Sequence, residues 1–466
     1  MVFSSLTFLF YFFPIYFIVY FAAKNRYKNL VILAGSLVFY GYGIMETPAY
    51  ILLILSAVVV NFRIAVQIDK KESAKAKKPW LITGLVYNFG ILFIFKYLDF
   101  AIDNFNLLSG YSGIKLPYAN LVLPIGISFY TFQIVSYLID VYRGKIAAEP
   151  SLLRLGAYLC LFPQLIAGPI VTYTEVKDSL MQRTHSLSGW ENGIREFTIG
   201  LSLKVLIANH MGGLWSQVGA IGYESISTPL AWLGIIAFSL QIYFDFYGYS
   251  LMAKGLGEMM GFTFPDNFRN PYLSISMTDF WRRWHMTLGR WFREYIYVPL
   301  GGNRRHTYRN LFIVWLLTGL WHGADWNYIL WGMFCCLLIC LERAGLGKLW
   351  KKYRLLGHLY MSFAIPLSWL IFAISDPEQL ILYLGRLFPF VKTTEYTVFA
   401  GDYLKYLDTY KGSLIAAILL CTGIPRKLYE KRKGSPIPAL MLVIAFWLCV
   451  YSMYQGLDDP FLYYQF

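Results

Sequence analysis

Long apolar runs separated by short basic loops dominate this chain. A helix needs about 20 apolar residues to cross a bilayer. Runs of suitable length lie near residues 2–22, 29–45, 49–68, 80–100, 119–140, 195–211, 229–252, 355–375 and 436–456. Runs near 152–172, 311–340 and 411–425 have lengths or interruptions that do not fit one straight span. The pattern predicts an all-α polytopic membrane protein with roughly ten to twelve spanning or re-entrant helices.

Cations between the runs predict the orientation of the chain. Lysines crowd the loop at residues 70–78, and lysines and arginines crowd the loop at 426–433, which the positive-inside rule places in the cytoplasm. The loops at 44–49 and 101–118 carry few cations and are expected outside. The first run precedes its cations and has no basic leader, so we expect a retained first span with its N-terminus outside the cytoplasm.

Composition agrees with a membrane protein and excludes several other classes. The chain is 57% hydrophobic and only 15% charged, and its net charge of +14 fits cytoplasmic loops and lipid headgroups, so we expect membrane lipids and no nucleic acid as partners. None of the six histidines has the spacing of a zinc site, and no two of the six cysteines form a CxxC pair, so we expect no metal. Without internal repeats or linkers, residues 1–466 are expected to form one domain.

The segment from Lys254 to Arg309 differs from the rest. It interleaves eight arginines, Arg282 and Arg283 among them, with seven aromatic residues between Phe280 and Tyr297. No continuous span fits, and the alternation predicts amphipathic helices lying in the cytoplasmic interface. A solvated basic loop would explain the arginines but not the rings.

The run at 311–340 contains the most informative stretch, Gly319–Trp326. His322 and Asp325 are ionisable residues at a depth where a bilayer makes them costly, and Gly319 and Gly323 loosen the helix there. Cations flank the run on both sides, and thirty residues are too few for two full spans, so we expect a bent or re-entrant helix pair. The alternatives are one long tilted span and a histidine that merely packs between helices. Asp325 either caps the second half-helix, the reading we prefer, or orients the imidazole of His322.

His322 and His285 form the leading candidate pair for chemistry. His285 ends the cluster Asp279–His285 in the arginine-rich segment. A histidine near neutral pKa can take a proton from an alcohol and return it to a leaving group. Two histidines from separate elements can divide these tasks, or one of them can position the substrate.

Three further polar residues are candidates for supporting roles. Asp245 lies late in an apolar span and either pairs with a nearby arginine or lines a cavity. Gln164, in the interrupted stretch Pro163–Pro169, either binds a polar substrate or sits in a structural loop. Asn270, with Asn267 and Pro271, is expected to form a turn, where any substrate contact would be secondary.

These motifs resemble the membrane-bound O-acyltransferase family nearly end to end. His322, preceded by Trp321, matches the family's hallmark histidine, and His285 matches the second histidine of bacterial members. The segment Trp291–Arg304, the opening Met1–Ser5 and the closing Phe461–Phe466 are similar to the alginate O-acetylation branch. The related branch that moves D-alanine toward teichoic acids usually lacks the run Pro299–Arg304. This chain departs from the pattern at Glu294 and Tyr464, and its 376–410 region, which has no counterpart that we can match, is a candidate partner-facing element.

The resemblance implies an acyltransferase of the bacterial cell membrane with a central tunnel. The acyl group, expected to be acetyl, would pass from a cytoplasmic thioester to a hydroxyl outside, either on an extracytoplasmic acetyltransferase or on a polysaccharide. The basic segment suits the phosphates of acetyl-CoA, and it suits an acidic acyl carrier protein equally. No bound cofactor is expected.

The working hypothesis is acyl transfer with His322 as general base and His285 as its assistant, and with Trp321, Asp325, Asp245, Gln164, Asn270, Arg282 and Arg283 as supporting residues. Alternatives remain. One is D-alanyl transfer toward teichoic acid from a carrier protein. A second is a transporter for a polysaccharide precursor, since broken helices beside polar residues also build transport sites. A third is a passive scaffold, for which replacement of His322 would change nothing.

Overall fold

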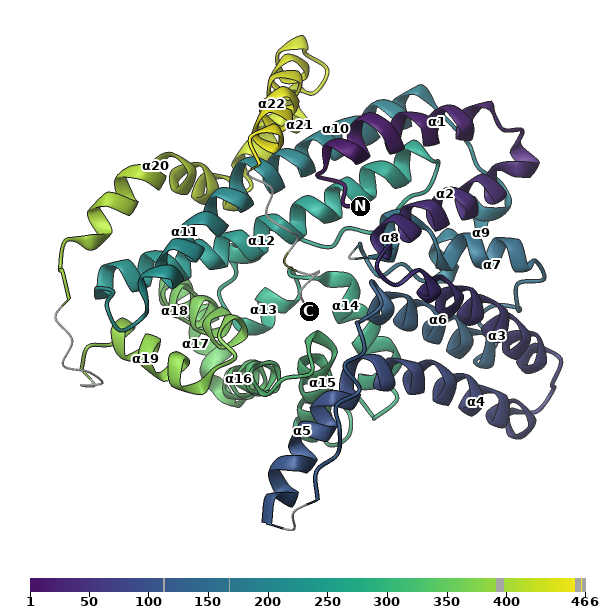
Figure 1. Cartoon of the computed structure of the whole chain (residues 1–466), viewed down its shortest axis with the longest axis horizontal. Coiled ribbons are helices and arrows are strands. Elements are labelled where there is room, and N and C mark those ends of the chain that lie inside the picture. Colours follow the sequence, from purple (N-terminus) through teal and green to yellow (C-terminus); the bar gives the residue numbers. More distant parts are fainter. Residues whose placement is uncertain (112–113, 167, 391–397, 457–461, 463–466) are drawn as a thin grey trace. The chain divides into compact units, whose positions relative to one another are not determined.

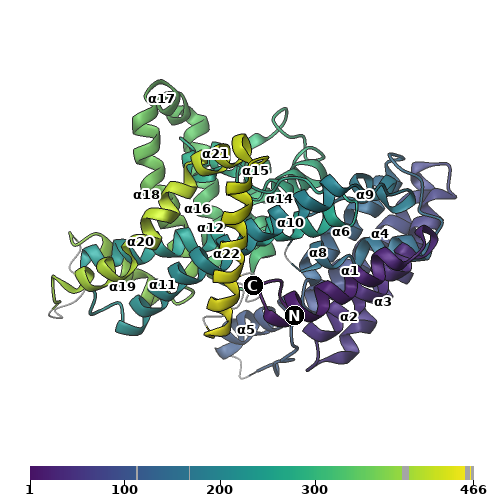
Figure 2. The same cartoon turned by 90° about the horizontal axis from the view of Figure 1, so that it is seen from above.

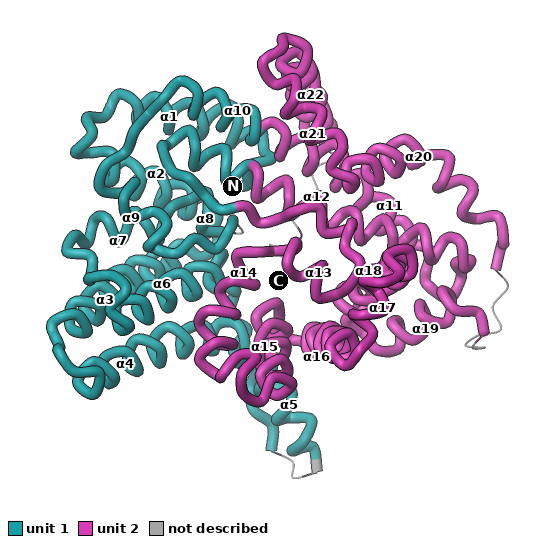
Figure 3. The backbone as a smooth tube through the Cα atoms, turned by 180° about the vertical axis from the view of Figure 1, so that it is seen from behind, with its two compact units in different colours: residues 1–197, 252–265 teal, residues 198–251, 266–466 magenta. Residues whose placement is uncertain are grey.

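The computed structural model describes residues 1–111, 114–166, 168–390, 398–456 and 462. All regular structure among these residues is helical. The chain forms two compact units, residues 1–197 with 252–265 (unit 1) and residues 198–251 with 266–466 (unit 2), which Figure 3 colours separately. Two long helices, α10 (Leu187–Ser202) and α12 (Thr228–Met259), contribute residues to both units.

Unit 1 contains the helices of the N-terminal part of the chain (Figure 1). They are η1 (Phe8–Phe12), α1 (Phe13–Ala22), η2 (Asn25–Tyr27), α2 (Lys28–Gly43), η3 (Pro48–Tyr50), α3 (Ile51–Asp69), α4 (Ala74–Leu92), η4 (Phe93–Tyr97), α5 (Leu98–Leu108), η5 (Ser109–Tyr111), α6 (Ile127–Tyr142), α7 (Leu152–Leu159), α8 (Phe162–Leu165) and α9 (Tyr173–Met181).

Unit 2 contains the helices that follow α10. They are η6 (Leu203–Ala208), α11 (Asn209–Ile221), η7 (Pro271–Leu273), α13 (Met277–Trp281), α14 (Met286–Phe292), η8 (Arg293–Tyr297), α15 (Thr307–His322), α16 (Trp326–Leu341), η9 (Glu342–Leu346), α17 (Gly347–Lys352), α18 (Arg354–Ala373), α19 (Pro377–Leu387), α20 (Asp402–Cys421), α21 (Ile424–Arg432) and α22 (Pro436–Tyr454).

Seven helices in the described part of the chain are long and apolar enough to cross a membrane. They cover Pro48–Asp69, Ala74–Leu108, Leu187–Ile221, Thr228–Met259, Trp326–Lys352, Arg354–Ala373 and Pro436–Tyr454. Helices α20 and α21 pass the same test only as a pair bent by 72°. The prediction of an all-α polytopic membrane protein is confirmed, and the protein crosses the membrane several times.

Buried polar pairs hold apolar helices together within unit 1. Helices α3, α4 and α6 pack against one another, as Figures 1 and 2 show. Asn61 on α3 and Asn88 on α4 exchange hydrogen bonds of 3.0 and 2.7 Å between their side-chain amides, and both residues are buried. Interhelical bonds of this kind stabilise packing where a bilayer provides no hydrophobic driving force.

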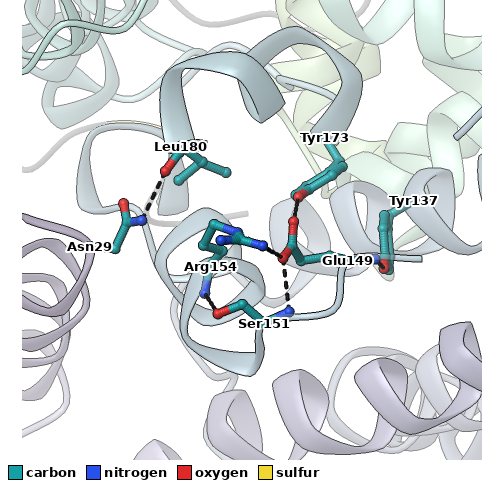
Figure 4. A network of polar contacts seen from close by, with 7 residues as sticks. All are labelled: Asn29, Tyr137, Glu149, Ser151, Arg154, Tyr173 and Leu180. Carbon is teal, nitrogen blue, oxygen red and sulfur yellow. Dashed lines mark hydrogen bonds and ion pairs between the residues drawn. The ribbon is translucent and has the colours of Figure 1, made fainter. Parts of the chain in front are cut away.

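A buried carboxylate joins three elements of unit 1 (Figure 4). Glu149, between α6 and α7, accepts hydrogen bonds from the Ser151 backbone (2.8 Å), the Arg154 guanidinium (2.7 Å) and the Tyr173 hydroxyl on α9. Its own backbone N–H donates to the hydroxyl of Tyr137 on α6, at 2.9 Å. Because this carboxylate is buried, removal of one of its partners would leave a buried charge without compensation.

The span predicted over 119–140 begins later than expected. Residues 119–126 are not helical, and α6 starts at Ile127 after Gly126, which has a φ of +73°. A side chain at Gly126 would collide with the carbonyl of Leu165. Pro124 and this glycine outweigh the hydropathy of the preceding residues, because backbone conformation decides where a helix can start.

The length estimate for the run at 311–340 was wrong for its second half. The path from α16 continues through η9, where Gly345 is not helical and kinks the chain, and through α17 to Lys352, and this stretch of 27 residues is long enough to cross a membrane. The apolar run underestimated it because the helix continues into charged residues after Leu341. The predicted break is confirmed, since residues 323–325 separate α15 from α16.

Candidate active site

His322 is the last residue of α15, and a tight helical hairpin places it. The chain turns extended at Gly323, and the Asp325 carboxylate then accepts a hydrogen bond from the Trp326 backbone (2.6 Å) as N-cap of α16. The capping role that we preferred for Asp325 is confirmed. The helices pack closely (Figure 1), and a Cβ added at Gly319 would lie 2.5 Å from the Tyr328 carbonyl.

Aromatic rings surround His322. Its imidazole centroid lies 4.9 Å from the ring of Trp321, 4.9 Å from that of Trp331 and 5.3 Å from that of Phe372 on α18. The side chain is 4% exposed. The rings therefore give this imidazole an apolar, largely dry environment, in which electrostatic interactions are stronger than in water.

His285 lies between two short helices, α13 and α14, in a conformation that non-glycine residues rarely adopt. Its φ is +42°, which breaks the segment and turns the ring inward, where it is 1% exposed. Its Nδ1 lies 3.1 Å from Oδ1 of Asn267, and its ring is 4.7 Å from Phe246. Burial lowers the pKa of His285 to about 3, so the imidazole is neutral at physiological pH.

Trp321 connects the two histidines. Its ring centroid lies 5.9 Å from the imidazole of His285 and 4.9 Å from that of His322. Residues 37 positions apart in sequence thus face the same indole, within unit 2. The predicted pair of histidines is brought together, as is the tryptophan expected to support them.

A carboxylate fixes the start of the helix that leads to His285. Glu342, the first residue of η9, accepts hydrogen bonds from the backbone N–H groups of Met277 (2.5 Å) and Thr278 (2.9 Å) and from the Thr278 hydroxyl (2.7 Å). These N–H groups open α13 and have no partner within the helix. Glu342 therefore anchors the His285-bearing segment to the helix that follows His322.

Asp245 forms a buried ion pair beside this site. Its carboxylate lies 2.6 Å from Nζ of Lys204 in the π-helix η6, and both side chains are at most 3% exposed. The predicted ion pair of Asp245 is confirmed, but its partner is a lysine and not an arginine. The next residue on α12, Phe246, is the one that packs against His285.

The remaining predicted supporting residues have described contacts with residues other than His285 and His322. Asn270 is in a left-handed turn before η7, as the turn prediction requires. Arg282 is exposed, and Arg283 pairs with Asp279 at 3.0 Å. Gln164 is buried in unit 1, where its Nε2 donates to the Tyr158 carbonyl at 2.7 Å.

The arginine-rich segment is amphipathic, as predicted, but its rings face inward. Trp284, Trp291 and Phe280 are buried in unit 2, whereas Arg290 and Arg293 are exposed. The aromatic residues thus form protein core around the histidines and leave the cations on the surface.

Some sequence motifs fall partly outside the described residues. Of the closing motif Phe461–Phe466 only Leu462 is described, and Ala167 interrupts the description of Pro163–Pro169. Residues 391–397 of the region 376–410 also lie outside it. Within the described residues, no cluster of three or more His, Cys, Asp or Glu side chains could hold a metal ion.

Comparison with known proteins now identifies the family. Residues 143–385, which include both histidines, match the model of the membrane-bound O-acyltransferase family. The chain belongs to the membrane-bound O-acyltransferase family. It is therefore an O-acyltransferase and a multi-pass bacterial membrane protein, as the sequence motifs predicted.

Curated relatives agree with this membrane-bound O-acyltransferase assignment. A probable alginate O-acetylase of Pseudomonas aeruginosa is 40% identical over 378 residues, which cover 80% of this chain and 72% of the relative. A peptidoglycan O-acetyltransferase of Helicobacter pylori is 34% identical over 81% of this chain and 78% of its own. A teichoic acid D-alanyltransferase of Bacillus subtilis is 30% identical over 51% and 63%.

Sequence reasoning missed three residues of this site. Asn267 was assigned to a turn, and its contact with His285 spans 18 positions, so no local pattern marks it. Lys204 and Glu342 did carry a signal, because each is a charged residue in or next to an apolar run.

Proposed function

We propose that the chain moves an acetyl group from a cytoplasmic thioester to a hydroxyl acceptor outside the membrane, for O-acetylation of a polysaccharide. The observation that carries the proposal is the shared contact of His285 and His322 with Trp321, deep in the apolar interior of unit 2. The names of the alginate and peptidoglycan relatives support acetyl transfer to a glycan.

His322 is the general base of the proposed reaction. Its imidazole takes the proton from the acceptor hydroxyl, and the oxygen attacks the thioester carbonyl. The C–S bond then breaks, and the imidazolium returns the proton to the departing thiolate. General base catalysis by a positioned imidazole contributes typically about 10²- to 10⁴-fold to the rate. No covalent acyl-histidine is required.

His285 assists as a neutral imidazole. The structure buries its ring against Phe246 and Trp321, which supports a role in positioning donor or acceptor or in stabilising developing charge. Trp321 orients both rings. Asp245, held by Lys204, supports the α12 surface that carries Phe246.

The donor is proposed to be acetyl-CoA. The exposed arginines of the segment, such as Arg282, Arg290 and Arg293, support binding of its phosphates on the cytoplasmic side. An acidic acyl carrier protein uses the same charges and is the alternative. The acceptor is either an extracytoplasmic acetyltransferase or the polysaccharide itself.

The finer architecture also belongs to this proposal. Ten to twelve spanning or re-entrant helices around a central tunnel would connect donor and acceptor. The seven long helices, the bent pair α20–α21 and the shorter apolar helix at Phe8–Ala22 account for nine of these helices in the described part of the chain. One domain over residues 1–466 is supported by α10 and α12, each of which contributes residues to both units.

D-alanyl transfer is the second candidate. The Bacillus subtilis D-alanyltransferase supports it, but over about half of this chain, whereas the acetyl-transferring relatives align over four fifths. Mass spectrometry separates the two, because acetyl and D-alanyl esters add different masses to the glycan.

Replacement of His322 in cells tests the proposal. We expect His322→Ala to abolish O-acetylation of the cell's polysaccharide, measured by mass spectrometry at matched protein levels. His358→Ala, which removes an exposed histidine of α18, is the control and should retain it. Retained acetylation in His322→Ala would overturn the catalytic assignment and favour the scaffold.

A further inference from the structure

The hydrogen bonds around Asn267 determine which way its side-chain amide faces. One amide atom lies 3.3 Å from the backbone nitrogen of Thr287 and 2.9 Å from the Thr287 hydroxyl, and the other lies 3.2 Å from the Ser250 hydroxyl. A backbone N–H can only donate, so the atom facing it must be the amide oxygen. The amide nitrogen then donates to Ser250.

This orientation determines where His285 carries its hydrogen. The same Oδ1 of Asn267 lies 3.1 Å from Nδ1 of His285. An amide oxygen has no hydrogen to give, so Nδ1 must be the donor. In a neutral imidazole the other nitrogen, Nε2, then carries a lone pair.

The surroundings of Nε2 leave that lone pair available for a ligand. Nε2 is fully buried and has no hydrogen-bond partner among the residues that the structure describes. The ring packs instead against Phe246 and Trp321. A buried acceptor without a partner is destabilising, and a ligand that donates a hydrogen bond would remove this cost.

We propose that Asn267 is a positioning residue that holds His285 as the Nδ1–H tautomer, so that Nε2 accepts a hydrogen bond from a hydroxyl group of the substrate. The part concerning substrate rests on the proposed function. In this tautomer the ring has no hydrogen at Nε2 with which to stabilise an oxyanion. His285 therefore positions the acceptor through a hydroxyl other than the attacking one, whose single proton goes to His322, and charge developing on the carbonyl oxygen must be stabilised elsewhere.

Nitrogen NMR of the full-length protein tests the tautomer directly. The chain is labelled with ¹⁵N-histidine in nanodiscs, and the His285 signals are assigned as those lost in His285→Gln. At pH 7 we expect a protonated Nδ1 and a bare Nε2. In Asn267→Leu the Nε2–H form should appear, whereas Asn267→Asp, which keeps an acceptor, should retain the wild-type pattern.

If a substrate hydroxyl donates to Nε2 of His285, variants that change the tautomer should also change the activity. With acetyl-CoA as donor and thiol release as readout, Asn267→Leu should lower kcat about tenfold or more, because a wrong tautomer presents a hydrogen where a lone pair is needed. KM for acetyl-CoA should stay within about twofold. Asn267→Asp should recover most of the rate. Asn310→Leu removes a buried asparagine of unit 2 whose Nδ2 donates to backbone carbonyls and whose Oδ1 accepts from Arg309, and it should leave the His285 signals unchanged.

Three results overturn parts of the proposal separately. A protonated Nε2 in the wild type, or unchanged signals in Asn267→Leu, overturns the tautomer assignment. Full activity in His285→Gln overturns the substrate contact and the assisting role of His285, even with the tautomer as expected. Loss of activity only in His322→Ala would thus leave general base catalysis by His322 standing while removing His285 from the mechanism.

Discussion

At the scale of single residues, one indole organises the chemistry. Trp321 was expected to support the site because it precedes His322, but sequence alone could not show that it also faces His285. That contact depends on the left-handed turn at His285, which aims the ring inward. The two histidines could be predicted as candidates because ionisable residues are costly near apolar runs. Asn267 could not, because asparagine is common in turns and its partner comes from another segment.

Trimming the indole tests its role. We expect Trp321→Ala to destabilise the protein by about 3–5 kcal/mol and to reduce thiol release strongly, because both imidazoles lose a packing surface. Trp321→Phe should keep more of the activity. Thermal unfolding in detergent and the thiol assay measure the two effects. Trp447→Ala, at an exposed tryptophan of α22, is the control; equal losses in the two alanine variants would contradict the assignment.

The buried imidazole of His285 predicts a pH dependence of stability. The pKa of His285 is about 3 in the folded protein and about 6.5 when unfolded, so between these values the unfolded state binds more protons. Stability should therefore fall as pH drops from about 6.5 toward 3, by at most about 1.4 kcal/mol per pH unit. Unfolding curves from pH 4.5 to 7 should show a steeper loss for the wild type than for His285→Gln. Parallel losses would show that His285 is not buried in this way.

At the scale of elements, the sequence predicted the break in the 311–340 run and the Asp325 cap because both follow from local backbone chemistry. It overextended the helix at 119–140, where Pro124 and Gly126 prevent it, and it missed the continuation beyond Leu341. It also took the rings between Phe280 and Tyr297 for interfacial anchors. Most of them are buried in the core of unit 2, whereas Trp281 and Tyr297 are partly exposed.

Because α15 packs closely on α16, we expect Gly319 not to tolerate a larger side chain. In Gly319→Ala the new methyl group would lie 2.5 Å from the Tyr328 carbonyl, so the helices must separate, at a cost of about 1–3 kcal/mol. Activity should fall as His322 shifts. Gly412→Ala on α20 meets no atom within 4 Å and should be neutral or slightly stabilising. Equal thermal stability of the two variants would contradict the packed hairpin.

The contacts of Glu342 predict that it couples the segment that carries His285 to the helix that follows His322. Glu342→Ala leaves the Met277 and Thr278 N–H groups without an acceptor, which costs about 1–3 kcal/mol and frees the segment that carries His285. Glu342→Gln keeps one oxygen and should be intermediate in both stability and activity. Glu430→Ala, at a surface salt bridge of α21, should change little. An active and stable Glu342→Ala variant would show that Glu342 does not anchor the segment that carries His285.

At the scale of the whole molecule, the family and the multi-pass membrane class could be predicted because their motifs can be recognised in one sequence. The alternation of apolar runs and cations predicted the helical membrane class, and the two histidine motifs predicted the reaction class. The donor, the acceptor and the polymer belong to surfaces and partners, and a motif does not encode them.

The most direct test of the central claim is thiol release by the purified protein. Proteoliposomes are given acetyl-CoA and a hydroxyl acceptor, either the glycan or the extracytoplasmic acetyltransferase, and free thiol and acetylated acceptor are measured for the wild type, His322→Ala and His358→Ala. If His322 is the general base, thiol and ester form in equal amounts in the wild type and in His358→Ala, and neither product forms in His322→Ala. Ester formation by His322→Ala at the wild-type rate would contradict the account.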